Sequence, residues 1–243
     1  VRIGFVNAHA MNLCHTDPAF LSRLLECDYV FRDGSGMKIL YRLLGRDPGL
    51  NMNGTDFIPQ IMELYKGQAV ALLGTDSPYL DRAAEKIEAM GLIPAHIING
   101  FHEAGIYVNR LKEKPVPLTI LAMGMPKQEH IAAQIAHTSP LPNVIVCGGA
   151  ILDFIGEKVT RAPEVFRTFG MEWLYRLILE PSRLFKRYVI GNAVFLGRAV
   201  SHALRGDRPA PSSSGRRRVL HVVRQYAPAI GGLESYVQSM VAH

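Results

Sequence analysis

Residues 118–136 read LTILAMGMPKQEHIAAQIA, and this stretch decides the fold. An apolar run at 118–123 is followed by Gly124 and Pro126, and then by a helix-like segment at 127–136. Short apolar runs bounded by glycine or proline are typical of buried parallel strands. Proline is also favoured in the first turn of a helix. The stretch therefore predicts a strand, a turn and a helix.

The same pattern recurs along the first two thirds of the chain. Further strand-like runs lie at 3–6, 29–31, 69–73, 95–98 and 144–147. Helix-like segments lie between them at 17–25, 37–44, 55–65 and 77–90. This alternation predicts an α/β fold with a Rossmann-like, mostly parallel sheet flanked by helices. In such sheets ligands bind at the carboxyl ends of the strands.

Strand signals stop after residue 160, where helix-like segments rich in arginine and aromatic residues begin. This change predicts a C-terminal helical appendage on the α/β core. A linker is indicated by RPAPSSSG at 208–215, and a strand-like run follows it. We therefore expect four parts, which are a core at 1–160, a basic helical appendage at 161–205, a linker at 206–218 and a truncated second domain at 219–243.

Composition and cysteine usage exclude several classes of protein. Hydrophobic residues make up 48% and charged residues 20% of the 243, which excludes a disordered chain, a collagen-like fibre and a coiled coil. Cys14, Cys27 and Cys147 are too few and too scattered for a disulfide framework or a zinc site. We expect a reducing, cytoplasmic compartment, and neither a signal peptide nor a membrane-spanning segment.

Charge is distributed unevenly between the two parts of the chain. Residues 1–160 contain 14 Lys and Arg and 16 Asp and Glu, a net charge of −2, whereas residues 161–243 contain 13 and 5, a net charge of +8. The excess indicates an anionic partner, which is a phosphate, a nucleic acid or an anionic membrane face, or else a solvated basic surface.

Three polar residues follow the first two expected strands. Asp33 comes directly after the strand at 29–31, where a carboxylate either accepts a proton from a substrate hydroxyl or caps the next helix. Asn7 offers a donor and an acceptor at the end of the first strand. His9 either titrates near neutrality or serves as a structural hydrogen-bonding residue.

Three later turns contain further candidates. Thr55 lies at a helix N-terminus, which binds an anion or is a plain cap. Lys127 and Gln128 suit a phosphate or a pyrimidine edge, whereas the structural alternative is that Lys127 and Glu129 form a solvated first turn. Gly149 and Asp153 follow another strand, where a carboxylate often binds ribose hydroxyls.

Two familiar nucleotide-binding motifs are absent from the sequence. Neither GxGxxG nor GxxxxGK[ST] occurs, which counts against NAD enzymes and P-loop NTPases. The appendage instead offers arginines at helical spacing, which clamp a diphosphate or form the solvated face of helices packed on the core. The candidates there are Arg161, Arg176, Arg183 and Arg187.

Together these motifs resemble the WecG/TagA/CpsF glycosyltransferases, glycosyltransferase family 26. The resemblance covers about residues 7–196. It is carried in order by DGxG (33–36), GTD (54–56), GMPKQE (124–129), GGAILDF (148–154), RAP (161–163), EWLYRL (172–177), EP (180–181) and RYxxGN (187–192). One departure is Phe5, which stands where many members have a threonine.

The resemblance implies an inverting transfer of a hexose from a UDP-sugar to a polyprenyl-diphosphate-linked acceptor in bacterial surface polysaccharide synthesis. The hexose is N-acetylmannosamine, its uronic acid or a related sugar. Asp33 is implied as the general base that deprotonates the acceptor hydroxyl, and Asn7 as a substrate contact. Gln128 is implied on the uracil side and Asp153 on the ribose side of the donor.

The appendage is implied to complete the site without a metal or another cofactor. Its arginines Arg176, Arg183 and Arg187 resemble those that close over the diphosphate and the membrane-bound acceptor. No Asp-x-Asp triplet, which many glycosyltransferases use to hold a metal, occurs in the sequence. The charge excess would then neutralise the departing UDP and attract anionic lipids.

We therefore expect a peripheral protein at the cytoplasmic face of the membrane and a homo-oligomer in solution. The alternative is a non-catalytic, nucleotide-binding assembly module at the membrane. A nucleic-acid partner is not expected, because no recognised motif accompanies the basic charge. Residues 219–243 resemble the start of a family 4 glycosyltransferase.

Overall fold

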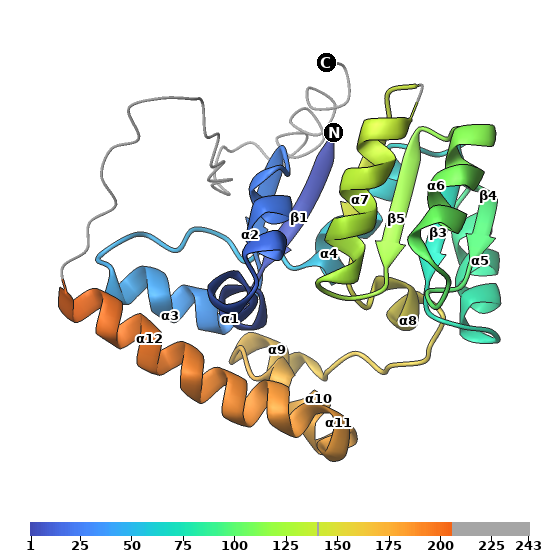
Figure 1. Ribbon diagram of the computed structural model, residues 1–243. Coiled ribbons are helices and arrows are strands. Elements are labelled where there is room, and N and C mark those ends of the chain that lie inside the picture. Colours follow the sequence, from blue (N-terminus) through green and yellow to red (C-terminus); the bar gives the residue numbers. More distant parts are fainter. Residues whose placement is uncertain (140, 206–243) are drawn as a thin grey trace, which may run out of the picture.

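The computed structural model describes residues 1–139 and 141–205, apart from the side chains of residues 183 and 205. Its centre is a six-stranded sheet in the order β2-β1-β6-β5-β3-β4, and every described strand pair is parallel (Figure 1). The strands are β1 (Arg2–Val6), β2 (Tyr29–Arg32), β3 (Ala69–Gly74), β4 (Ile93–Ile98), β5 (Leu118–Ala122) and β6 (Val144–Cys147). All six carboxyl ends therefore meet at one edge of the sheet.

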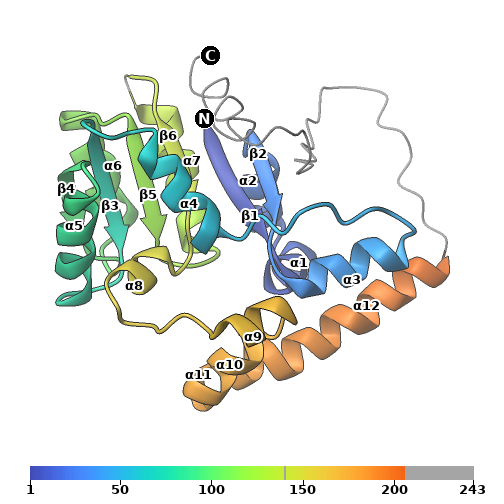
Figure 2. The same ribbon diagram turned by 180° about the vertical axis from the view of Figure 1, so that it is seen from behind.

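Helices cover both faces of this sheet (Figures 1 and 2). One face has α1 (Ala8–Thr16), α2 (Pro18–Leu25), α6 (Ala104–Glu113) and α7 (Lys127–Thr138), in which α2 contacts both α1 and α7. The other has α4 (Gly54–Glu63), α5 (Tyr79–Ala89) and α8 (Ile151–Ile155), in which α8 contacts α4 and α5. The neighbouring strands β1 and β6 are thus followed by helices on opposite faces, the arrangement that marks a ligand-binding crevice in open α/β sheets.

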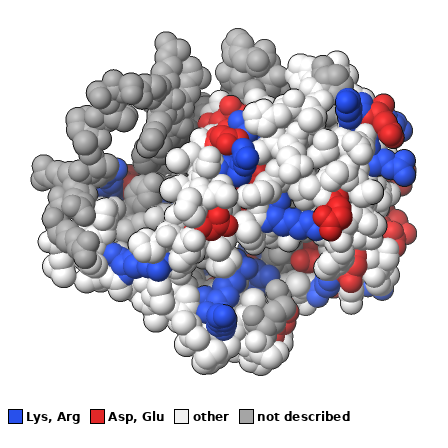
Figure 3. All heavy atoms as spheres, viewed as in Figure 1, with Lys and Arg blue, Asp and Glu red and all other residues white. Residues whose placement is uncertain are grey.

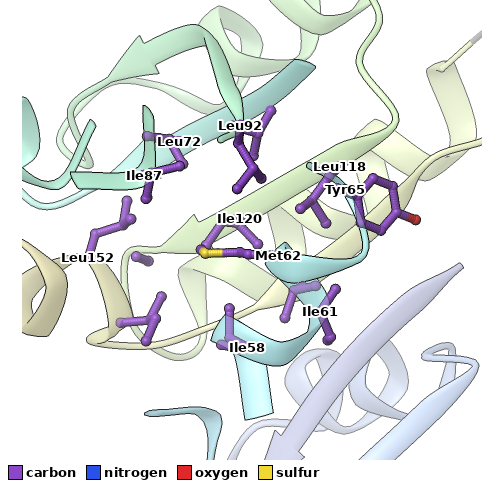
Figure 4. Packing of buried hydrophobic residues seen from close by; sticks show 14 of the residues in the cluster. Ile58, Ile61, Met62, Tyr65, Leu72, Ile87, Leu92, Leu118, Ile120 and Leu152 are labelled. Carbon is purple, nitrogen blue, oxygen red and sulfur yellow. The ribbon is translucent and has the colours of Figure 1, made fainter. Parts of the chain in front are cut away.

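The core lies between the sheet and these two helical layers. Alternate residues of one strand point to opposite faces, so Leu72 packs toward α4 and α5 while Leu73 packs toward α6 and α7. Figure 4 shows Met62 of α4 lying beside Ile120 of β5. This two-sided burial holds the strand ends, and the turns that follow them, in fixed positions.

The chain after residue 160 forms a third layer below the carboxyl ends of the strands (Figure 1). It contains α9 (Glu164–Thr168), α10 (Glu172–Leu179), α11 (Pro181–Phe185), the π-helical turn η1 (Lys186–Ile190) and α12 (Gly191–Arg205). Phe195 and Ala199 of α12 pack on Met37 and Leu40 of α3 (Ser35–Leu43).

Asn12 also joins this layer to the core through polar contacts. The Asn12 Nδ2 of α1 donates to the Gly191 carbonyl at 2.7 Å, and its Oδ1 accepts from Arg198 Nη1 at 2.9 Å. The C-terminal helices are therefore held against the edge of the sheet by both apolar and polar contacts.

The predicted fold is confirmed, with differences at particular elements. Helices α1 and α6 occupy segments where no helix was expected, and β4 begins at Ile93 rather than at 95. No described helix, within 1–139 or 141–205, is long and apolar enough to cross a membrane. The division between core and appendage stays a prediction, and the expected linker and family 4 fragment lie outside the described residues.

Candidate functional site

Asp33 lies at the carboxyl end of β2, beside the end of β1. Its backbone N–H donates to the Val6 carbonyl at 2.8 Å, so the two strand ends are joined at this residue. The next helix, α3, has Gly34 as its N-cap with φ +85° and no side-chain capping bond. The Asp33 carboxylate therefore does not cap α3, which was the structural alternative for this residue.

The surroundings of Asp33 place its pKa near neutrality. Burial raises the pKa of this carboxyl from 3.8 to about 6 and outweighs a hydrogen bond from the Asn7 side chain, which lowers it. Glu172 raises the pKa further, whereas Arg187 and Arg176 lower it. A carboxylate of this pKa is ionised at pH 7 yet basic enough to accept a proton, as a general base requires.

Asn7 and His9 lie at the end of β1, next to Asp33. Asn7 is the N-cap of α1, and its side-chain oxygen accepts from the Ala10 N–H at 3.0 Å. Its amide nitrogen is thus directed to Asp33. Burial, aided by Arg187, lowers the pKa of His9 to about 4. Of the two alternatives for His9, this favours the structural one, because a partly buried imidazole beside a guanidinium stays neutral.

Gln128 is fully buried and holds the glycine turn after β6. Its Oε1 accepts from the Gly149 N–H at 3.0 Å, and its Nε2 donates to Glu129 Oε1 at 2.8 Å. At Gly148 a Cβ would lie 2.6 Å from the Ile151 side chain, so only glycine fits there. The structure thus engages the Gln128 amide with protein groups, and its contact with uracil stays a prediction.

Glu129, for which the structural alternative was a solvated first turn, is instead a buried carboxyl. Its side chain is 1% exposed, and Oε2 has no hydrogen-bond partner among the described residues. Burial raises the pKa of Glu129 to about 7, although hydrogen bonds from Gln128 and from its own backbone oppose this. The glycine turn that Gln128 holds is therefore linked to a carboxyl whose pKa lies near neutrality.

Asp153 of α8 lies farther along the same edge of the sheet. The Thr75 hydroxyl, just beyond β3, donates to Asp153 Oδ1 at 2.5 Å. The adjacent Asp76 forms an ion pair with Lys158. The predicted ribose contact thus has a protein partner that the motifs did not indicate.

Two further predicted residues, Lys127 and Arg161, contact other protein groups, and a third, Thr55, does not supply the helix cap. Lys127 Nζ donates to the carbonyls of Gly100 at 2.9 Å and His102 at 2.8 Å. Arg161 forms an ion pair with Asp56, which tethers the start of the appendage to α4. Thr55 lies in the first turn of α4, where Asn53 rather than Thr55 supplies the cap.

The appendage arginines approach the site from below. The Arg176 guanidinium lies 5.4 Å from the centre of the Phe154 ring, and Arg187 lies 5.6 Å from that of Tyr188. Figure 3 shows Lys and Arg side chains gathered over α9 and α10. The side chain of Arg183 lies outside the described residues.

The structure therefore assembles two groups along one sheet edge, with the Gln128–Gly149 contact between them. Asp33, Asn7, His9, Arg176 and Arg187 form the first, and Thr75 and Asp153 form the second. Across residues 1–139 and 141–205, no group of three or more His, Cys, Asp or Glu side chains is placed to hold a metal ion.

The sequence is similar to known proteins. A family model described as the glycosyl transferase WecG/TagA/CpsF family matches residues 1–209. The N-acetylglucosaminyldiphosphoundecaprenol N-acetyl-beta-D-mannosaminyltransferase of Bacillus spizizenii is 24% identical over 174 residues, which is 69% of this chain. The match spans 66% of that relative's own length, just under two thirds.

Proposed function

The chain belongs to the WecG/TagA/CpsF family of glycosyl transferases, and we propose that it transfers a hexose from a UDP-sugar to a polyprenyl-diphosphate-linked acceptor, with inversion. The relative's name supports the acceptor class, since it specifies an N-acetylglucosaminyl-diphosphoundecaprenol acceptor and an N-acetylmannosaminyl group. We propose the same sugar class here, which is N-acetylmannosamine, its uronic acid or a related hexose, used in surface polysaccharide synthesis.

The observation that carries the proposal is the environment of Asp33. Its carboxylate lies at a sheet edge, is held by Asn7 and has a pKa raised by burial to about 6. In the proposed reaction it accepts the proton of the acceptor hydroxyl. The hydroxyl oxygen then bonds to the anomeric carbon as the bond from that carbon to UDP breaks, which inverts the configuration.

Positive charge near Asp33 suits the leaving group. The departing UDP gains negative charge, which must be neutralised in the transition state. Arg176 and Arg187 are near enough to Asp33 to lower its pKa, which supports a role for them at the proposed reacting centre. We propose that they, with Arg183, stabilise UDP without a metal ion or other cofactor, while Arg161 anchors the start of the appendage.

The appendage also presents a surface suited to a lipid-linked acceptor. Exposed apolar side chains include Phe169 at 71% and Ile178 at 62% exposure, on the same helical layer as the arginines. Apolar and basic residues together favour anionic membrane surfaces. We propose a peripheral location at the inner face of the membrane, and a homo-oligomer in solution.

The test compares Asp33→Asn with the wild type in the transfer of N-acetylmannosamine from its UDP-sugar to an N-acetylglucosaminyl-diphospho-polyprenyl acceptor. Loss of the base should lower turnover by about 10²- to 10⁴-fold, while UDP binding measured by calorimetry stays close to the wild-type value. Asp81→Asn, at an exposed position of α5, is the matched control and should keep full turnover.

Near-normal turnover by Asp33→Asn would refute the assignment of the base. UDP binding without transfer by the wild type would favour the non-catalytic assembly module instead. Binding of UDP that requires Mg²⁺ or Mn²⁺ would overturn the arginine-based account of the leaving group.

A further inference from the structure

We propose that Thr75 is a positioning residue that fixes the Asp153 carboxylate toward the two ribose hydroxyls of the donor, so that the site selects ribonucleotides over 2′-deoxyribonucleotides. This inference rests on the proposed function, because it assumes a nucleotide-sugar donor. It adds a residue that lies outside every motif on which the family resemblance depends.

The backbone of Thr75 adopts a conformation that its side chain disfavours. Its φ is +43°, in the left-handed region, and its side chain is only 6% exposed. A β-branched residue at positive φ is a genuine outlier, since its Cβ crowds the backbone. Such residues cluster at functional sites, where the surrounding structure compels the conformation.

Contacts from distant parts of the chain hold Thr75 in this conformation. Its N–H donates to the Ala122 carbonyl at 3.3 Å, and its own carbonyl accepts from the Gly100 N–H at 2.8 Å. At Gly74, with φ +156°, a Cβ would lie 2.3 Å from the Ala122 oxygen. The ends of β3, β4 and β5 thus lie close together, and the backbone of Thr75 is held between them.

The strained conformation brings the Thr75 hydroxyl to Asp153. Oγ1 lies 2.5 Å from Asp153 Oδ1 and 3.4 Å from Asp76 Oδ1. The single hydroxyl proton therefore goes to Asp153, while Lys158 pairs with Asp76. The hydrogen bond from Thr75 engages Oδ1 of Asp153, and Oδ2 is the oxygen that we assign to the ligand.

The position of this pair fits the nucleoside end of a donor. A carboxylate at the carboxyl edge of a parallel sheet is the usual partner of a ribose diol in α/β folds. Asp153 lies in α8, the helix that begins directly after the turn that Gln128 holds, and Asp33 follows β2, on the far side of β1 from that turn. A nucleotide sugar extended along this edge would place its ribose at Asp153 and its sugar near Asp33.

The experiment measures binding of UDP and of 2′-deoxy-UDP by calorimetry to the full chain and to its variants. The wild type should prefer UDP by about 10- to 100-fold, because 2′-deoxy-UDP leaves a carboxylate oxygen unpartnered. Thr75→Val removes the hydroxyl at nearly constant shape and should reduce the preference to below about 3-fold. Thr75→Ser keeps the hydroxyl and should restore the preference, which a purely structural role of Thr75 would not predict.

Three further variants keep the inference falsifiable. Asp153→Asn should lose the preference, and Thr75→Val combined with it should lose no more, because both act through one carboxylate. Thr119→Val is the matched control, since Thr119 is a buried threonine of β5 whose hydroxyl has no partner among the described residues. It should keep the wild-type preference.

The outcomes separate this inference from the proposed function. An unchanged preference in folded Thr75→Val, with UDP bound, would overturn the role of Thr75 and leave the donor class intact. The wild type could instead bind another nucleoside diphosphate and not UDP. If Thr75→Val then lost the preference for the 2′-hydroxyl of that nucleotide, the result would support the role of Thr75 but refute a uracil-containing donor. Failure of the wild type to bind any ribonucleoside diphosphate would refute both.

Discussion

Replacing Glu129 with glutamine should change how the stability of the protein depends on pH. Glu129 is 1% exposed, and burial raises its pKa from 4.5 to about 7. Since the folded state binds this proton more tightly than the unfolded state, its contribution to stability is fully present below pH 4.5. That contribution is lost as the pH rises through 7.

The magnitude follows from the size of the pKa change. One pH unit corresponds to about 1.4 kcal/mol, so a rise from 4.5 to about 7 costs about 3 kcal/mol of unfolding free energy at pH 8. Glutamine keeps an oxygen that accepts from Gln128 but cannot ionise. The NH₂ that replaces the second carboxyl oxygen changes the free energy of unfolding by an amount that does not vary with pH.

The assay is urea unfolding of the wild type and of Glu129→Gln between pH 4.5 and 8.5. The difference in unfolding free energy between them should change by about 3 kcal/mol over this range, in favour of the variant at high pH. Glu88→Gln, at an exposed position of α5, should run parallel to the wild type. A difference for Glu129→Gln that stays constant within about 0.5 kcal/mol would refute the reasoning.

Three further predictions concern the site and its support. Asn7→Ser keeps a cap for α1 but removes the amide that donates to Asp33 and lowers its pKa. The acidic limb of the pH–rate profile, expected near pH 6, should therefore move to higher pH. An unmoved limb would show that Asn7 does not lower the pKa of the base. Gly148→Ala places a Cβ 2.6 Å from Ile151 and 2.9 Å from Ile58, so chemical denaturation should show a loss of about 1–3 kcal/mol, and wild-type stability would contradict the packing. Asn12→Ala removes both contacts to the C-terminal layer, so limited proteolysis should cut after residue 160 faster than in the wild type; equal cutting rates would argue that apolar packing alone holds α12.

The sequence predicted the sheet well because each strand is a short apolar run closed by turn residues. It missed α1 because Asn7 both ends β1 and caps the helix that starts at Ala8, so no turn separates the two. It truncated β4 because Pro94 weakens a strand signal, although proline is tolerated in an edge strand such as this one.

The place of Asp33 directly after a strand made it a candidate, but that place left proton acceptance and helix capping both open, and the role of general base came from the family resemblance. The site was not predictable where the effect comes from residues far apart in sequence. Thr75 is strained by Ala122 and Gly100, and Glu172 reaches Asp33 only once the C-terminal helices have packed. No local pattern contains either relation.

The side-chain carboxyls with a shifted pKa divide into two sets by the direction of the shift. Where the pKa is lowered, each group pairs with Lys or Arg, as Asp56 does with Arg161 and Glu26 with Arg2. Where it is raised, in Asp33 and Glu129, burial is the first cause and both residues follow the carboxyl ends of strands. Raised values cost stability at neutral pH, and a fold selected for stability alone would not retain such groups there.

Asp33 makes the argument sharper, because two arginines act on it and its pKa still stays above the ordinary value. An ion pair with either arginine would leave a weakly basic carboxylate that accepts protons poorly. Burial that outweighs both charges keeps the carboxylate basic while the same arginines remain close to the place where UDP would leave. The edge of the sheet thus separates the two requirements of the proposed transfer, a base for the acceptor hydroxyl and positive charge for the leaving group.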